Sequence, residues 1–215
     1  MKRTTLAAIA ALAAGLCLAD AVPAMVSLVT PVQFPSRERD VAGLRLDLVY
    51  GQCRNFKGLD LGLANHAVDG FSGLALGGVN AVGGRFYGVQ AGLANWIGSG
   101  CAQDLDERRS VGIQFGFANV ADSFCGLQEG WVNVATDSLA GLQAGYLNVA
   151  GEVHGVQCGS YFVLGVNIVS GSASGCQIGL VNYAGRMEEG VQIGILNIIT
   201  RNGWLPVCPL VNGSR

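Results

Sequence analysis

An eight-residue phrase, G-x-Q-x-G-x-x-N with apolar residues in most open positions, recurs along nearly the whole chain. Most successive copies begin 14 or 15 residues apart. With a weaker copy at Gly43 and a last one closing at Asn212, the chain holds about eleven units. Such repetition indicates an architecture in which each unit packs on its neighbours. The well-formed copies begin at Gly58, Gly73, Gly88, Gly112, Gly126, Gly141, Gly155, Gly175 and Gly190.

Within each unit the residue pattern is that of a β-strand. Apolar residues occupy positions two, four and six of most copies, while Gly, Gln and Gly occupy positions one, three and five. This alternation has a period of two, and two glycines per unit disfavour a helix. If copies stack, the Gln and Asn residues form columns in which side-chain amides hydrogen-bond to one another. Glycine lets adjacent backbones turn or approach closely.

Two all-β folds satisfy this pattern. We expect a β-solenoid of about eleven coils of 14–15 residues. The alternative is an antiparallel outer-membrane β-barrel, with positions two, four and six facing lipid and the protein associated with the membrane. The nearly uniform connections favour the solenoid, because a barrel alternates short and long turns. Glu129 interrupts the apolar stripe, where a charge facing lipid is costly.

The N-terminus has the pattern of an export signal. Lys2 and Arg3 precede an apolar stretch, which ends in small residues at Ala19 and Ala21. We expect the mature chain to begin near Val22. The predicted organisation is a signal peptide over 1–21, a cap segment over 22–42, the repeat array over 43–204 with insertions near 96–111 and 160–164, and a capping repeat over 205–215.

Composition limits the classes of partner. The formal net charge is -2 without a basic stripe, which argues against nucleic acid. No apolar run after the N-terminus is long enough for a transmembrane helix. Six cysteines remain beyond Cys17, an even number in an exported chain where disulfides are permitted, and their connectivity stays open. Pro31 and Pro35 near one end, with Pro206 and Pro209 near the other, predict blunted sheet edges.

Two groups of residues are candidates for binding, and both have a structural explanation. The insertion before Gly112 carries a charge cluster that we expect to be a surface loop; loops often carry function, but charge runs are more often only solvated. Aromatic residues of the array are possible contacts, or they serve packing. The candidates are Trp96, Asp104, Asp106, Arg108, Arg109, Trp131, Tyr146 and Tyr183.

No arrangement of residues indicates catalysis. His66 and His154 occupy different positions in their units, and neither has a nucleophile or carboxylate at a spacing typical of a triad or a metal site. Glycines recur at the repeat spacing with no Lys-Ser or Lys-Thr after them, which argues against a phosphate loop. We therefore expect no enzyme activity, no cofactor and no metal.

The chain resembles the bacterial surface repeat-containing proteins. The resemblance lies in Gly-Val-Gln-Ile-Gly-Ile-Leu-Asn at 190–197, in the opening stretch 27–33 leading to 43–46, and in the close from Asn202 to Asn212. It implies export and a place in the cell envelope (periplasm, outer membrane or cell surface), with no assigned activity. The end at Arg215 lacks the terminal aromatic expected of a barrel.

Three classes of function remain from the sequence. We expect first a non-enzymatic envelope protein that is structural or binds a partner, itself unidentified. The second class is a small outer-membrane barrel or pore. The third is an envelope carbohydrate-active enzyme. Loss of activity on changing a carboxylate at 104–107 would identify this class.

Overall fold

The computed structural model describes residues 21–98, 110–160 and 164–215. Within them, nine strands form one open sheet in the order β2-β1-β3-β4-β5-β6-β7-β8-β9, which confirms the all-β prediction and is not closed into a barrel. The predicted signal peptide, apart from its last residue Ala21, and the centres of both predicted insertions lie outside the described residues. The strands are β1 (Ala21–Val29), β2 (Val32–Phe34), β3 (Asp40–Val82), β4 (Arg85–Ile97), β5 (Ser110–Gly145), β6 (Leu147–Gly159), β7 (Val166–Ile178), β8 (Val181–Arg201) and β9 (Val207–Gly213).

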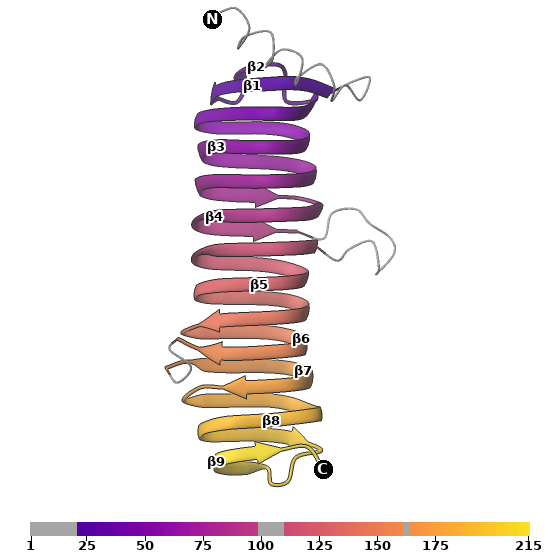
Figure 1. The fold of residues 1–215 in the computed structure, drawn as a ribbon, viewed down its shortest axis with the longest axis vertical. Helices are drawn as coiled ribbons and strands as arrows, with labels where there is room; N and C mark the ends of the chain where they lie inside the picture. The colour runs from indigo at the N-terminus through magenta and orange to yellow at the C-terminus, as the bar shows by residue number, and fades with distance from the viewer. Residues whose placement is uncertain (1–20, 99–109, 161–163) are drawn as a thin grey trace, which may run out of the picture.

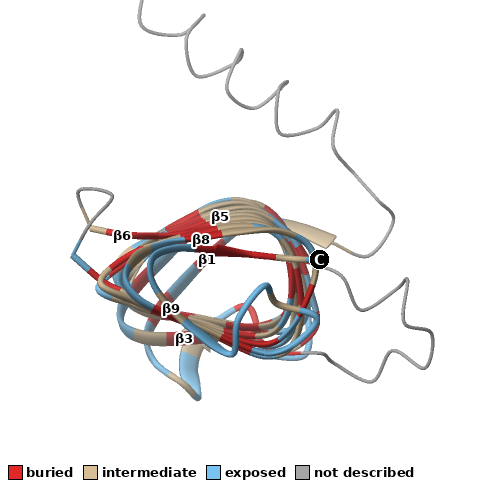
Figure 2. Ribbon diagram, turned by 90° about the horizontal axis from the view of Figure 1, so that it is seen from below, coloured by how far each residue is buried: buried red, intermediate tan, exposed pale blue. Residues whose placement is uncertain are grey.

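Successive units lie one above another as parallel coils (Figure 1), and the long strands β3, β5 and β8 each wind through more than one coil. Gly73 pairs with Gly88 and Asn80 with Asn95, so identical positions of the phrase are neighbours. The longer step to the next copy keeps this register, since Gly88 pairs with Gly112. Seen along its axis, the column has the outline of a flattened loop (Figure 2). The expected alignment of like residues over like is confirmed.

The first glycine of each unit makes a corner that other residues cannot make. Ten of these glycines, from Gly43 to Gly190, have φ between 129° and 152°, a region that side chains with a Cβ rarely enter. Close stacking adds a second constraint, because a Cβ on Gly126 would lie 2.0 Å from the carbonyl oxygen of Gly112. The recurring glycine is therefore required by both the local backbone and the coil beneath it.

Two ladders of side-chain amides run through the interior. In the Gln ladder each Nε2 donates to the preceding Oε1, as from Gln143 to Gln128 at 2.7 Å. In the Asn ladder each Nδ2 donates to the following Oδ1, as from Asn133 to Asn148 at 2.9 Å. Both ladders are buried. Because all bonds of a ladder run in one direction, its first and last residues each lack one ladder partner. The end atoms left without any hydrogen-bond partner are Gln90 Nε2, Gln192 Oε1 and Asn65 Oδ1.

Apolar side chains fill the interior between the ladders. One column stands two residues before the corner glycine, where Phe71 and Phe86 stack with ring centroids 5.5 Å apart. Another stands two residues after the Asn of each unit. Together they make one continuous core, typical of an array that buries its interior coil by coil. Buried members are Phe56, Phe71, Phe86, Phe124, Leu139 and Val153 in the first column and Ala67, Val82, Ile97, Ala121, Ala135, Ala150, Val169, Ala184 and Ile199 in the second.

Both ends of the column carry antiparallel strands. β2, between Pro31 and Pro35, pairs antiparallel with β1, and β9 pairs antiparallel with β8. The last segment, predicted to be a capping repeat, does not continue the parallel stack, because Asn212 pairs antiparallel with Gln192 and Cys208 with Asn197. The chain reverses after Asn202, which has φ of 67°, so the final segment covers the last coil without adding another.

Candidate docking face and its aromatic hollow

The large apolar side chains of the repeated phrase point outward. Gln and Asn face the interior, which leaves the large apolar side chains of positions two, four and six on the surface of successive coils; Leu93 is 72% exposed and Ile195 is 67% exposed. We call this surface the apolar face. Its exposed members are Leu44, Leu46, Leu48, Leu59, Leu63, Leu76, Leu93, Phe115, Phe117, Trp131, Tyr146, Ile193 and Ile195.

The interior is filled by the ladders and the inner columns, and the apolar face lies outside this core. Ten coils about 4.8 Å apart and four strand steps of about 3.3 Å give it roughly 43 by 13 Å, or about 600 Å². Typical monomers show largest apolar patches of about 300–600 Å², and patches of that size are often functional. The area is below the roughly 800 Å² that each partner contributes to a standard protein interface.

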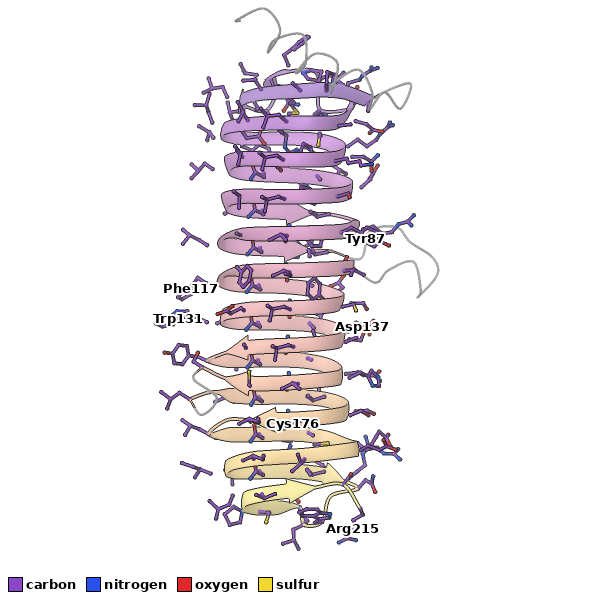
Figure 3. All side chains as sticks on the ribbon, in the orientation of Figure 1. Tyr87, Phe117, Trp131, Asp137, Cys176 and Arg215 are labelled. Atoms are coloured by element: carbon purple, nitrogen blue, oxygen red, sulfur yellow. The ribbon has the colours of Figure 1, made fainter. Side chains whose placement is uncertain are left out.

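Charged side chains gather away from this face. Phe117 and Trp131 project from one side of the column and Asp137 from the other (Figure 3). An ion pair on the charged side joins Arg186 Nε to Glu188 Oε1 at 3.0 Å. Within the described part of the apolar face, the one charged residue at an outward position is Glu129. The column is thus amphipathic across its width.

Three aromatic side chains form a ridge on the apolar face. Phe117, Trp131 and Tyr146 share position six of successive coils, which brings their side chains together along the column. The centroids of Phe117 and Trp131 are 5.3 Å apart, and those of Trp131 and Tyr146 are 5.0 Å apart. Such contacts contribute about 0.5–1.5 kcal/mol each beyond area burial. Phe117 stacks on Trp131 and Tyr146 lies tilted against it, so Trp131 has an aromatic neighbour in both adjacent coils.

A hollow of about 740 Å³ opens beside this ridge. Its lining includes Glu129, Trp131, Tyr146, Leu142 and Cys158. The outward side chains become small just past the aromatic ridge: position four changes from Glu129 to Ala144, and position six changes from Tyr146 to Ser160. The hollow is therefore a consequence of these smaller residues, and it lies within the size range of small-molecule sites.

The thiol in this hollow is not an activated nucleophile. Burial raises the pKa of Cys158, and the neighbouring Cys176 raises it further. A raised pKa keeps the sulfur protonated, whereas nucleophilic cysteines are thiolates. The described cysteines, Cys53, Cys125, Cys158, Cys176 and Cys208, are free thiols.

A buried ionic cluster lies in the interior near the N-terminal end. Arg45 and Asp60 replace Gln in the ladder column, and the guanidinium binds the Asp60 carboxylate through two nitrogens, one bond being 2.8 Å. Arg45 Nη1 also donates to the His66 carbonyl at 2.8 Å, and its guanidinium lies 5.0 Å from the Phe56 ring centroid. These contacts make Arg45 a structural residue, because paired donors compensate for the burial of its charge.

Asp47 is the member of the cluster that lacks hydrogen bonds. Neither carboxylate oxygen has a hydrogen-bond partner, although Oδ2 lies 3.1 Å from Arg45 Nε. Burial raises the pKa of Asp47 to about 7, against the opposing charge of Arg45. The Asp47 side chain is fully buried, and it occupies the space that a Cβ on Gly51 would fill. The Arg45 side chain is fully buried as well.

The structure brings together only some of the residues predicted from the sequence. Trp131 and Tyr146 both line the hollow. Trp96 is exposed on β4 and Tyr183 is half-buried on β8, each directly after the Asn of its unit, so neither belongs to the ridge. The charged candidates Asp104, Asp106, Arg108 and Arg109 lie outside the described residues.

Sequence reasoning missed Phe117 and Glu129 as members of a site. Phe117 was identifiable because it shares position six with Trp131 and Tyr146. Glu129 was visible as an exception in the apolar stripe, but its relation to a hollow depended on the size of residues in later coils.

Among the residues that the structure describes, no group of three His, Cys, Asp or Glu side chains is arranged to hold a metal ion. In the same described part, no helix has the length and apolar character needed to cross a bilayer. Comparison of the chain with protein-family models, curated proteins and solved structures gave no match. The resemblance to surface repeat proteins therefore stays a prediction.

Proposed function

We propose that this chain is an exported, non-enzymatic protein of the bacterial cell envelope, a scaffold that binds a partner through its apolar face. In this proposal the molecule is a β-solenoid whose coil is the 14–15-residue unit. The observation that carries it is the inverted alternation: amides fill the interior and large apolar side chains point outward. A sequence that exposes its apolar positions regularly, after completing its core with other residues, indicates a surface selected for contact.

The export pattern and the face together define the proposed place of action. Residues 1–21 have the charge and apolar pattern of a signal peptide, and removal of this segment leaves the column as the mature protein. A rigid array of coils presents an extended surface without needing a partner for its own stability. The role is therefore structural or partner-binding, with the charged side facing solvent.

Fractionation of the producing bacterium tests this proposal. Mass spectrometry of the full-length expressed chain should show a mature N-terminus near Val22, and the protein should be in the envelope fraction. A variant with Leu93→Gln and Ile195→Gln should move to the soluble fraction without a change in melting temperature, because both side chains are largely exposed. The matched control Thr136→Gln, exposed on the charged side, should stay in the envelope fraction. Retention of the double variant there would contradict the role of the apolar face.

A further inference from the structure

Glu129 departs from the repeat in a way that folding does not explain. Other coils place Leu46, Leu76, Phe115 or Ile193 at the same outward position. Its side chain is exposed, and no cation of the described residues lies within ion-pair distance of its carboxylate. A carboxylate on an otherwise apolar face weakens that face as a plain hydrophobic contact. Local exceptions of this kind are expected at functional sites.

The aromatic rings around Glu129 add a second attraction for positive charge. Trp131 and Tyr146 line the same hollow as the carboxylate. Tyr146 lies tilted against Trp131, and the next residue at position six is the small Ser160, which also lines the hollow. Aromatic rings that line a hollow beside a carboxylate add the attraction of their quadrupoles for a cation to that of the charge.

The remaining lining decides which kind of cation fits. Leu127, Leu142 and Ala144 supply apolar walls around the one carboxylate. A bare metal ion needs several oxygen ligands, which this lining does not supply. An anion is repelled by Glu129. The complementary ligand carries its positive charge on an apolar body.

We propose that this hollow binds an organic cation of the alkylammonium class, with Glu129 pairing its charge and Trp131 and Tyr146 contacting its carbon atoms. The site rests on the proposed function, since it lies on the apolar docking face and gives that face its chemical selectivity. Free solutes and phosphocholine lipid headgroups both carry such a cation, so the probes must separate these two sources.

Calorimetric titration of the mature chain with choline tests the site. Choline should bind saturably, and its uncharged isostere 3,3-dimethylbutan-1-ol should bind at least about tenfold more weakly. Glu129→Gln, which keeps the side-chain shape and removes the charge, should lower the choline affinity about tenfold, equivalent to about 1.4 kcal/mol. Glu152→Gln removes an exposed carboxylate outside the hollow and should leave the affinity unchanged. Tyr146→Leu should also weaken choline while altering the isostere little.

Co-sedimentation with phosphatidylcholine vesicles identifies the source of the cation. Sedimentation that depends on Glu129 assigns the lipid headgroup, and choline binding without sedimentation assigns a soluble amine; either result supports the site. Absence of choline binding, equal binding of the isostere, or an unchanged affinity in Glu129→Gln would overturn it. The envelope fractionation of the Leu93 and Ile195 variant reports on the face separately, so either proposal can fail alone.

Discussion

Replacing Asn133 by Leu tests whether the buried amide ladder stabilises the column. Asn133 is completely buried at the middle of the Asn ladder. Its Nδ2 donates to Ala144 O and to Asn148 Oδ1, each at 2.9 Å, and its Oδ1 accepts from Asn119 Nδ2 at 2.9 Å. Leu has the same branching at Cγ, so the change removes polarity with little change in shape.

The expected cost follows from these three bonds. Each contributes about 1 kcal/mol net, and leaving Asn148 Oδ1 without its donor costs about 1–3 kcal/mol more. The more apolar side chain returns roughly 1 kcal/mol. We therefore expect Asn133→Leu to lower the free energy of unfolding by roughly 3–5 kcal/mol. Urea unfolding followed by circular dichroism measures this difference, with the midpoint falling at a constant slope.

The first Asn of the ladder supplies a matched control. Asn65 makes two donor bonds, and its Oδ1 has no partner, so Asn65→Leu removes an unsatisfied buried acceptor together with the bonds. One bond fewer and the relieved acceptor together should make this substitution about 2–4 kcal/mol less costly than Asn133→Leu. Equal midpoints for the two variants, or an unchanged midpoint for Asn133→Leu, would refute the reasoning that the ladder stabilises the stack.

Two further predictions concern the corners and the buried carboxyl. Gly126→Ala should destabilise the protein by at least about 3 kcal/mol in the same urea assay, because φ of 139° is strained for alanine and the Cβ would meet Gly112 O. The control Gly70→Ala should cost under about 1 kcal/mol, because the atom nearest to its new Cβ belongs to the Asn55 side chain, at 3.0 Å. Equal costs for the two variants would contradict the role of the corner glycine. The pKa of Asp47 is raised from 3.8 to about 7 in the folded protein, so the fold favours the protonated carboxyl. The free energy of unfolding therefore falls as pH rises from about 4 to about 7, where the carboxyl ionises more readily in the unfolded chain than in the fold. Asp47→Asn should therefore raise the melting temperature more at pH 8 than at pH 5, and an equal shift at both pH values would count against this.

Much of the fold follows from the periodic residues themselves. Gly at position one recurs from Gly43 to Gly190, and Asn at position eight recurs from Asn65 to Asn197, because stacking applies the same geometric demand each time. Their register, the amide columns and the open sheet were all predictable. The alternation of Gln with apolar residues shows which side chains share a face of the strand, but it does not show which of the two faces is buried. Only the additional buried columns, such as Phe86 and Ile97, decide that the apolar stripe faces outward.

The ends of the column were less predictable for a physical reason. A terminal segment has no next coil to impose the register, so Leu205 to Asn212 keeps a trace of the phrase and yet pairs antiparallel. Likewise Arg45 and Asp60 occupy the ladder column near the other end, where they satisfy each other in place of amides. The hollow beside Glu129 depends on residue sizes in three successive coils, which the average phrase conceals.

Distances between spin labels on position six test the stacked arrangement most directly. In a background with the native cysteines replaced by alanine, labels would be placed at Leu63 and Trp131, four coils apart, and at Leu63 and Ile195, eight coils apart. A column with coils about 4.8 Å apart predicts separations of about 19 and 38 Å. A second distance equal to or shorter than the first, as in a sheet whose ends meet, would contradict the stack.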